Sequence, residues 1–154
     1  MLEAERIATE AHAGQADKSG RPYIEHPRRV AAWAARLNPD VPAAVVDAAW
    51  LHDVLEDTAL TRDDLAARGI SPEAIAMVEA LTKRDGEPPE AYFARVLACP
   101  GALEVKRADL ADNTDPDRLG RLDDATRSRL EAKYAAAFRM LGIEPVHGRA
   151  GSAA

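Results

Sequence analysis

Apolar residues recur at helical spacing along nearly the whole chain, and no run alternates apolar and polar residues with the period of two that a strand requires. Alanine, the strongest helix former, fills many of these positions. The pattern predicts an all-α fold, with helices over residues 2–14, 27–37, 42–57, 61–69, 71–83, 90–98, 102–113 and 124–141.

Local signals mark several of these boundaries. Thr61, with Asp64 three residues later, and Ser71 before a proline are typical N-terminal caps of helices. The segment 99–101 (Cys-Pro-Gly) predicts a break, and residues 114–120 are expected to be irregular. Together these signals predict short helices joined by short loops.

The length of 154 residues fits one domain with a single core. We expect this domain to span residues 1–144 and to be followed by a flexible tail over residues 145–154, which includes His147. The tail is predicted from its small-residue composition.

Charge and composition exclude several classes of protein. Lysine and arginine number 20 against 26 acidic residues, with no basic run that could follow a nucleic-acid backbone. The apolar stretches are too short to span a membrane, and the acidic N-terminus lacks the features of a signal peptide. A lone Cys99 cannot form an internal disulfide and is interpreted as a small buried hydrophobe. We therefore expect a cytoplasmic protein that binds neither nucleic-acid polymers nor membranes.

Imidazole and carboxylate groups occur together on three of the predicted helices: His26 at a helix start, His52-Asp53 with Glu56-Asp57, and the acidic residues of 109–113. His52 follows Ala48 by four residues and therefore lies on the apolar face of its helix. Buried groups of this kind are tolerated chiefly when they are paired or bind a metal. Two imidazoles with two carboxylates suit a divalent ion such as Mn, Fe, Co or Zn.

Three segments, residues 11–27, 51–58 and 81–83, closely resemble the hydrolase domain of RelA/SpoT-type alarmone enzymes, which belongs to the HD superfamily. The resemblance spans about residues 8 to 113. Together with the short length of the chain, this resemblance makes it look like one of the stand-alone small alarmone hydrolases. The resemblance implies the helical bundle of an HD domain.

The resemblance also implies an activity and its residues. That family removes the 3′-pyrophosphate from guanosine tetra- and pentaphosphate with one divalent ion, Mn²⁺. Carried over by position, the implied metal ligands are His26, His52, Asp53 and Asp109. Glu56 and Asp57 would orient or deprotonate the attacking water, and Asn113 would face the nucleotide. A metal and a nearby carboxylate are suited to this reaction, because the metal lowers the pKa of water and the carboxylate takes its proton.

The substrate contacts and one of the metal ligands each have an alternative interpretation. Lys18 and Ser19 are predicted substrate contacts, with solvated loop residues as the alternative reading. Asp112 is a rival to Asp109 as a metal ligand, although Asp109 fits the family's KxAD pattern better.

The chain departs from the family at two positions on the substrate side. Asp17 and Asp115 stand where the family has arginines, and the first of those arginines lies against the base. Asp17 could accept hydrogen bonds from a different base or point to solvent. The sequence therefore leaves the preferred base open.

Two other functions remain open at this point. One is an HD nucleotidase or phosphatase that acts on another 3′- or 5′-phosphorylated nucleotide. The other is a nucleotide-binding sensor without turnover. Trp33 and Trp50 are interpreted as core or subunit contacts, and a subunit contact would be consistent with a homo-oligomer.

Overall fold

The computed structural model describes residues 1–147, and these contain helices and no β-strand, with an isolated bridge between Ala16 and Pro22. The helices are α1 (Glu3–Ala11), α2 (Glu25–Leu37), α3 (Ala43–Leu51), α4 (Val54–Asp57), α5 (Arg62–Ala67), α6 (Pro72–Leu81), α7 (Pro89–Ala98), α8 (Ala102–Asn113), α9 (Pro116–Leu119) and α10 (Asp124–Leu141). The predicted all-α class is confirmed.

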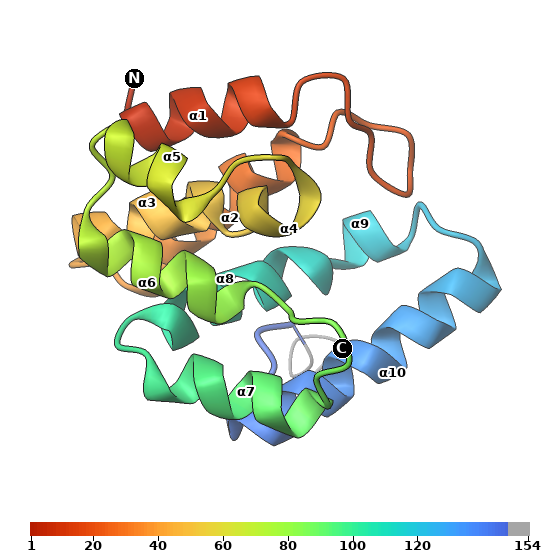
Figure 1. Ribbon diagram of the computed structural model, residues 1–154. Coiled ribbons are helices and arrows are strands. Elements are labelled where there is room, and N and C mark those ends of the chain that lie inside the picture. Colours follow the sequence, from red (N-terminus) through yellow and green to blue (C-terminus); the bar gives the residue numbers. More distant parts are fainter. Residues whose placement is uncertain (148–154) are drawn as a thin grey trace.

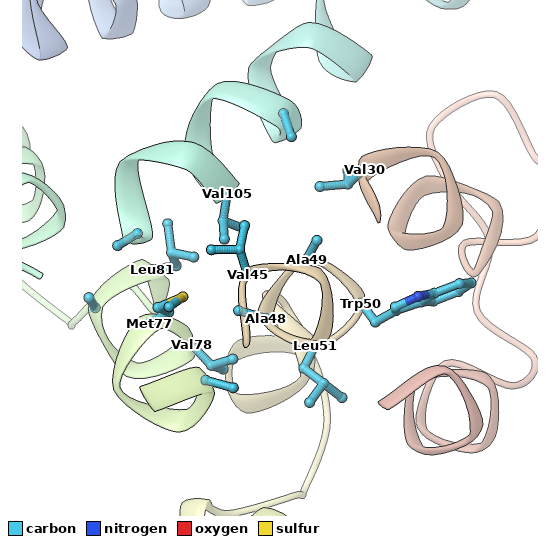
Figure 2. Close-up of a cluster of buried hydrophobic side chains, with 14 of the residues drawn as sticks. Val30, Val45, Ala48, Ala49, Trp50, Leu51, Met77, Val78, Leu81 and Val105 are labelled. Atoms are coloured by element: carbon cyan, nitrogen blue, oxygen red, sulfur yellow. The ribbon is translucent and has the colours of Figure 1, made fainter. Parts of the chain in front are cut away.

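Helix α3 lies at the centre of the bundle and packs against α1, α2, α6 and α8 (Figure 1). It is apolar on nearly every face, as expected of a helix that neighbours enclose. Val45 lies beside Val105 of α8, and the same cluster includes Met77 of α6 (Figure 2). Burial of this apolar surface is the main stabilising contribution.

A close approach between α3, α6 and the start of α8 requires a glycine. Gly101 precedes α8 with a φ of +85°, and a Cβ built on it would lie 2.5 Å from the Met77 side chain and 3.3 Å from Val45. Glycine alone fits both the backbone and the space. This contact fixes where α8 begins and therefore where its acidic residues lie.

The caps at Thr61 and Ser71 are as predicted: Thr61 forms a capping box with Asp64, and Ser71 accepts a hydrogen bond from the backbone of Ala74. The segment 114–120, expected to be irregular, contains the short helix α9. Asp115 caps that helix by accepting from the backbone nitrogen of Asp117 at 2.9 Å. None of the helices within residues 1–147 has the length and apolar character that crossing a bilayer requires.

The expected continuous helix over residues 42–57 is wrong, because α3 ends at Leu51 and α4 begins at Val54, with His52 and Asp53 between them. The carbonyl of Ala49 accepts a hydrogen bond from Nδ1 of His52 at 2.8 Å, and Asp53 has φ −105° and ψ −2°. In a continuous helix, side chains of consecutive residues project about 100° apart. The break allows His52 and Asp53 to reach the same point.

Three further expectations concern single residues. His147, expected in a loose tail, lies 2.9 Å from the carbonyl oxygen of Ala111 and packs edge-on against Trp33. The remainder of the predicted tail, 148–154, lies outside the described residues. Cys99 is free and partly buried, and Trp50 is buried in the core.

Candidate metal centre and adjoining cavity

The first turn of α2, the break after α3 and the last half of α8 meet at one point, because these helices pack on one another. Each supplies a polar side chain to a largely apolar region: His26, His52 and Asp109 are all buried. The three carry ligand atoms that lie within 4.8 Å of one another and could hold a metal ion.

Distances within this group are short. Nε2 of His26 lies 3.0 Å from Oδ1 of Asp109, and Nε2 of His52 lies 3.4 Å from the same oxygen. Asp53 is not one of these three residues, but its Oδ2 lies 3.1 Å from Nε2 of His52 and 4.0 Å from Nε2 of His26. Ligands bound at about 2.0–2.2 Å from a common ion are separated by similar distances.

The ring nitrogens indicate which atoms face the centre. Nδ1 of His52 must donate a hydrogen to the Ala49 carbonyl, which can only accept. Nε2 of His52 is buried and has no hydrogen-bond partner among the described residues. A buried nitrogen without a partner beside two carboxylates fits a divalent cation, because the cation would provide the missing interaction.

Oppositely charged groups in this region shift one another's pKa values in the direction that favours the charged forms. Burial raises the pKa values of Asp53 and Asp109, but neighbouring positive groups outweigh burial and hold both below their usual range. For Asp109 the strongest of these groups is Lys106, whose Nζ lies 3.1 Å from Oδ2. Burial lowers the pKa of His52, but Asp53 and Asp109 raise it well above the ordinary value. Asp53 also accepts a hydrogen bond from the hydroxyl of Tyr23.

Glu56 and Asp57 lie beside this group on α4, and their carboxylates lie within 4.8 Å of that of Asp53. Oε1 of Glu56 accepts a hydrogen bond from the backbone nitrogen of Lys83 at 2.9 Å. Partial burial and the negative charges of Asp53 and Glu56 raise the pKa of Asp57. A carboxylate with a raised pKa is a better proton acceptor.

A cavity of about 660 Å³ opens onto these residues and extends between α7 and α10. The four lysines of the chain, at positions 18, 83, 106 and 133, all line it, as do Arg84 and Arg118. Its lining also includes apolar side chains, among them Leu122, Leu130 and Met140. The cavity therefore combines a positively charged region near the carboxylates with an apolar region.

The predicted substrate contacts have mixed placements. Lys18 and Ser19 line the cavity. Asn113 also lines it, but its amide nitrogen donates to Asp109 at 3.0 Å and its oxygen accepts from Arg118 at 2.6 Å. Both ends of the Asn113 amide are thus engaged with protein, and its first role is to hold Asp109.

Asp17 orders its own loop. Its Oδ1 accepts hydrogen bonds from Ser19, through the backbone nitrogen at 2.9 Å and the hydroxyl at 2.7 Å, and from the backbone nitrogen of Arg21 at 3.0 Å. Asp115, the other departure, caps α9, and Arg118 on that helix lines the cavity. A guanidinium is therefore present on the substrate side despite the two replacements.

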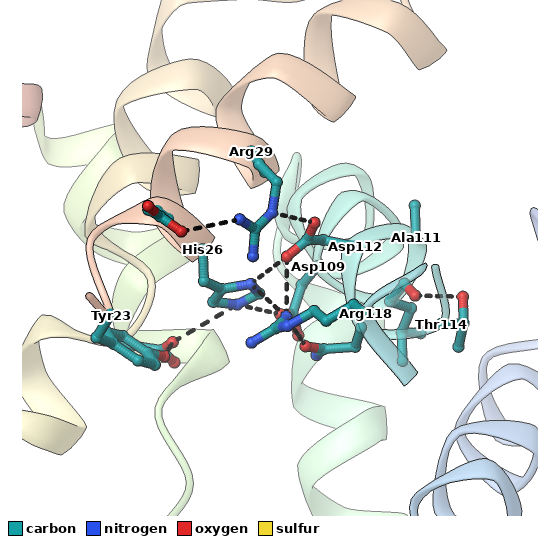
Figure 3. A network of polar contacts seen from close by, with 12 residues as sticks. Tyr23, His26, Arg29, Asp109, Ala111, Asp112, Thr114 and Arg118 are labelled. Carbon is teal, nitrogen blue, oxygen red and sulfur yellow. Dashed lines mark hydrogen bonds and ion pairs between the residues drawn. The ribbon is translucent and has the colours of Figure 1, made fainter. Parts of the chain in front are cut away.

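Sequence reasoning missed several residues of the site, namely Tyr23, Arg29, Arg118 and Lys133. No spacing pattern links them to the HD pair, because they reach the site from other helices and loops. Asp112, the rival ligand, lies on the Nδ1 side of His26 at 2.7 Å, whereas Asp109 lies on the Nε2 side (Figure 3).

Comparison with known proteins identifies the family of the chain. Residues 4–96 match the HD domain family. The chain is 37% identical over 152 residues to a guanosine-3′,5′-bis(diphosphate) 3′-pyrophosphohydrolase of Haemophilus influenzae, covering 91% of this chain and 22% of that protein. It is 33% identical over 158 residues to the bifunctional (p)ppGpp synthase/hydrolase SpoT of Escherichia coli, covering 95% of this chain and 22% of that protein. The chain thus spans about a fifth of the length of these relatives.

A solved structure of a metazoan orthologue of SpoT that hydrolyses ppGpp is similar in fold. The TM-score is 0.75 at 21% sequence identity, and the match covers 90% of this chain and 83% of the other. The described part of the chain therefore has the same fold as that protein.

Proposed function

The chain belongs to the HD-domain family, and from this premise we propose that it is a metal-dependent phosphohydrolase of alarmone nucleotides. The proposed reaction removes the 3′-pyrophosphate from guanosine tetra- or pentaphosphate, or from a related alarmone. Relatives named as 3′-pyrophosphohydrolases support it over most of the length of this chain.

One observation carries the proposal: two histidine Nε2 atoms and two aspartates lie together in the wall of a cavity that all four lysines line. We propose His26, His52, Asp53 and Asp109 as ligands of one divalent ion. Two nitrogens and two oxygens favour Mn²⁺ or a similar borderline ion over Ca²⁺. Such an ion would lower the pKa of a bound water molecule and would neutralise negative charge on the phosphoryl group.

Glu56 and Asp57 are the proposed catalytic residues. Lys83 fixes Glu56 through its backbone nitrogen, which leaves the other carboxylate oxygen of Glu56 able to hold a water. Asp57, with its raised pKa, is suited to accept a proton from that water. The water oxygen bonds to the phosphorus nearest the ribose, the bond from that phosphorus to the 3′ oxygen breaks, and the 3′ oxygen takes a proton. Pyrophosphate and a 3′-hydroxyl nucleotide leave.

The lysines favour a substrate with several negative charges. Partial burial and the charges of Lys83, Lys106 and Lys18 lower the pKa of Lys133, so these cations repel one another when no anion lies between them. Asp109 neutralises Lys106, whereas no acidic side chain within the described residues forms an ion pair with Lys83 or Lys133. A polyphosphorylated nucleotide would neutralise this repulsion better than a monophosphate.

Two other functions are compatible with the same cavity. An HD phosphatase for a singly phosphorylated nucleotide would use the same metal ligands but fewer of the lysines. A sensor without turnover would bind the nucleotide but would not need Glu56 and Asp57. The partner in every case is a small nucleotide, and the free Cys99 favours the reducing cytoplasm as the compartment.

The test is a panel of nucleotides incubated with purified protein and Mn²⁺, with products identified by chromatography. We expect the protein to hydrolyse guanosine tetraphosphate and its adenosine counterpart much faster than nucleoside monophosphates. A chelator should stop this hydrolysis. Binding without turnover would favour the sensor, and preference for a monophosphate would favour the phosphatase.

A further inference from the structure

Asp112 on α8 is a buried carboxylate that lies outside the proposed set of metal ligands. It is 1% exposed, and three side chains contact it, two from α2 and one from α9. Nδ1 of His26 lies 2.7 Å from Oδ2, Nε of Arg29 lies 2.7 Å from Oδ1, and Nη1 of Arg118 lies 2.8 Å from Oδ2 (Figure 3).

The two arginines explain how this carboxylate is buried with its charge. An isolated buried carboxylate is strongly unfavourable, whereas one that is hydrogen-bonded to guanidinium groups is tolerated. Arg29 lies one turn after His26 on α2, and Arg118 reaches Asp112 from α9. Both oxygens of Asp112 therefore have cationic donors, and Oδ2 also faces the imidazole of His26.

The geometry at Oδ2 determines which nitrogen of His26 carries a hydrogen. An ionised carboxylate only accepts hydrogen bonds, so Nδ1 of His26 must donate across the 2.7 Å contact. Nε2 of His26 also faces a carboxylate oxygen, Oδ1 of Asp109 at 3.0 Å, which is the spacing of two ligands that share one ion. Nη1 of Arg118 lies 2.9 Å from the same Nδ1, but both atoms are directed at Oδ2, so their proximity follows from two donors sharing one acceptor. If Nδ1 instead accepted from Arg118, its lone pair would face the lone pairs of Oδ2.

We propose that Asp112 is a positioning residue for the metal centre. By accepting the Nδ1 hydrogen, it fixes the tautomer and the orientation of His26 in which the Nε2 lone pair faces Asp109 and the bound ion. Carboxylates that orient a ligating histidine in this way commonly change metal affinity or activity about 10- to 100-fold when they are replaced. The inference rests on the proposed function in one respect, that His26 is a metal ligand.

Asp112→Asn is the direct test, because it keeps the shape and removes the charge. An asparagine has one oxygen and one NH₂ group, so an N–H must face either Arg29 or the pair His26 and Arg118, all of which are donors. We expect the Kd for Mn²⁺, measured by calorimetry without nucleotide, to rise about 10- to 100-fold. The matched control is Asp64→Asn, the same chemical change in the exposed capping box of α5, which should leave the Kd unchanged.

A second measurement needs no variant. Long-range ¹H–¹⁵N correlation spectra of metal-free wild-type protein, at a pH where the imidazole is neutral, report which nitrogen of His26 carries the hydrogen. The expected result is a protonated Nδ1 and an unprotonated Nε2, and the same assignment with Zn²⁺ bound.

Two results would overturn the inference: a folded Asp112→Asn protein with wild-type Mn²⁺ affinity, or a wild-type His26 with its hydrogen on Nε2. If Asp112→Asn does not fold, the wild-type spectrum still tests the inference, because it shows which nitrogen of His26 carries the hydrogen. If the wild type binds no Mn²⁺, the proposed function fails, while the tautomer is still read from the metal-free protein.

Discussion

The backbone nitrogen of Lys83 donates a hydrogen bond to Oε1 of Glu56 at 2.9 Å, which joins the loop after α6 to α4. The two residues are 27 positions apart in the chain. Lys83 also lines the cavity, so one residue holds a proposed catalytic carboxylate by its backbone and faces the substrate region with its side chain.

The double variant Glu56→Gln with Asp57→Asn is expected to lower kcat about 10²- to 10⁴-fold, because no carboxylate remains to take the proton of the water. A glutamine oxygen at position 56 can still accept from Lys83, so the fold is retained. Steady-state kinetics with Mn²⁺ checks the rate, and calorimetry checks that the ion still binds. Full metal-dependent turnover by this variant would show that these roles are assigned wrongly.

Replacement of His52 is expected to abolish stabilisation by metal. Wild-type protein should show a rise in Tm with Mn²⁺, since an ion that binds only the folded state stabilises it. His52→Ala should show none, because it removes a proposed ligand. His147→Ala is the control, since that histidine contacts the Ala111 carbonyl and lies outside the group that could hold an ion. An unchanged Mn²⁺ response in His52→Ala would exclude this residue as a ligand.

Metal affinity is expected to rise with pH. Asp53 and Asp109 raise the pKa of His52, so in metal-free protein its imidazole keeps a proton above the ordinary pKa of about 6.5. The stability from this charge is fully present below that value and is lost as pH rises through the raised pKa. A metal ion must displace the same proton, so binding becomes tighter over that range.

Calorimetry in two buffers of different ionisation enthalpy measures this proton release. We expect about one proton to be released for each metal ion that binds near neutral pH. Affinity that is constant with pH and binding without proton release would contradict a site that includes His52.

Lys133→Met is expected to weaken binding of highly charged nucleotides selectively. Lys133 is one of the lysines that line the cavity, and charged contacts with phosphate contribute about 1.5 to 3 kcal/mol. KM for guanosine tetraphosphate should therefore rise about 10- to 100-fold, and the affinity for a nucleoside monophosphate should change less. The control is Arg139→Met on the same helix, an exposed arginine that does not line the cavity. Equal effects on both nucleotides would place Lys133 away from the additional phosphates.

The sequence predicted the helices well, because alanine-rich periodicity and local caps such as Thr61 with Asp64 are properties of neighbouring residues. It failed at His52 and Asp53, where a side-chain hydrogen bond to the Ala49 carbonyl accompanies the break in the helix. That interaction has no signature in hydrophobic spacing. The break is also what brings the two side chains to one centre.

The same limit applies to the site. The HD pair and its acidic neighbours could be singled out from their local order, but Arg118 could not, because its position depends on how α9 lies against α8. The loss of arginine at positions 17 and 115 suggested a missing positive charge on the substrate side. The fold brings a guanidinium to the cavity lining from Arg118, where it pairs with Asp112, while Asp17 is engaged in ordering its own loop.

The central claim is metal-dependent release of pyrophosphate by attack at the phosphorus nearest the ribose. It is tested most directly by ³¹P NMR of guanosine tetraphosphate hydrolysis in H₂¹⁸O with Mn²⁺. The account predicts GDP and pyrophosphate as products, with one ¹⁸O in the pyrophosphate and none in the nucleotide, and no reaction after chelation. Release of orthophosphate, label in the nucleotide, or turnover that persists without metal would contradict it.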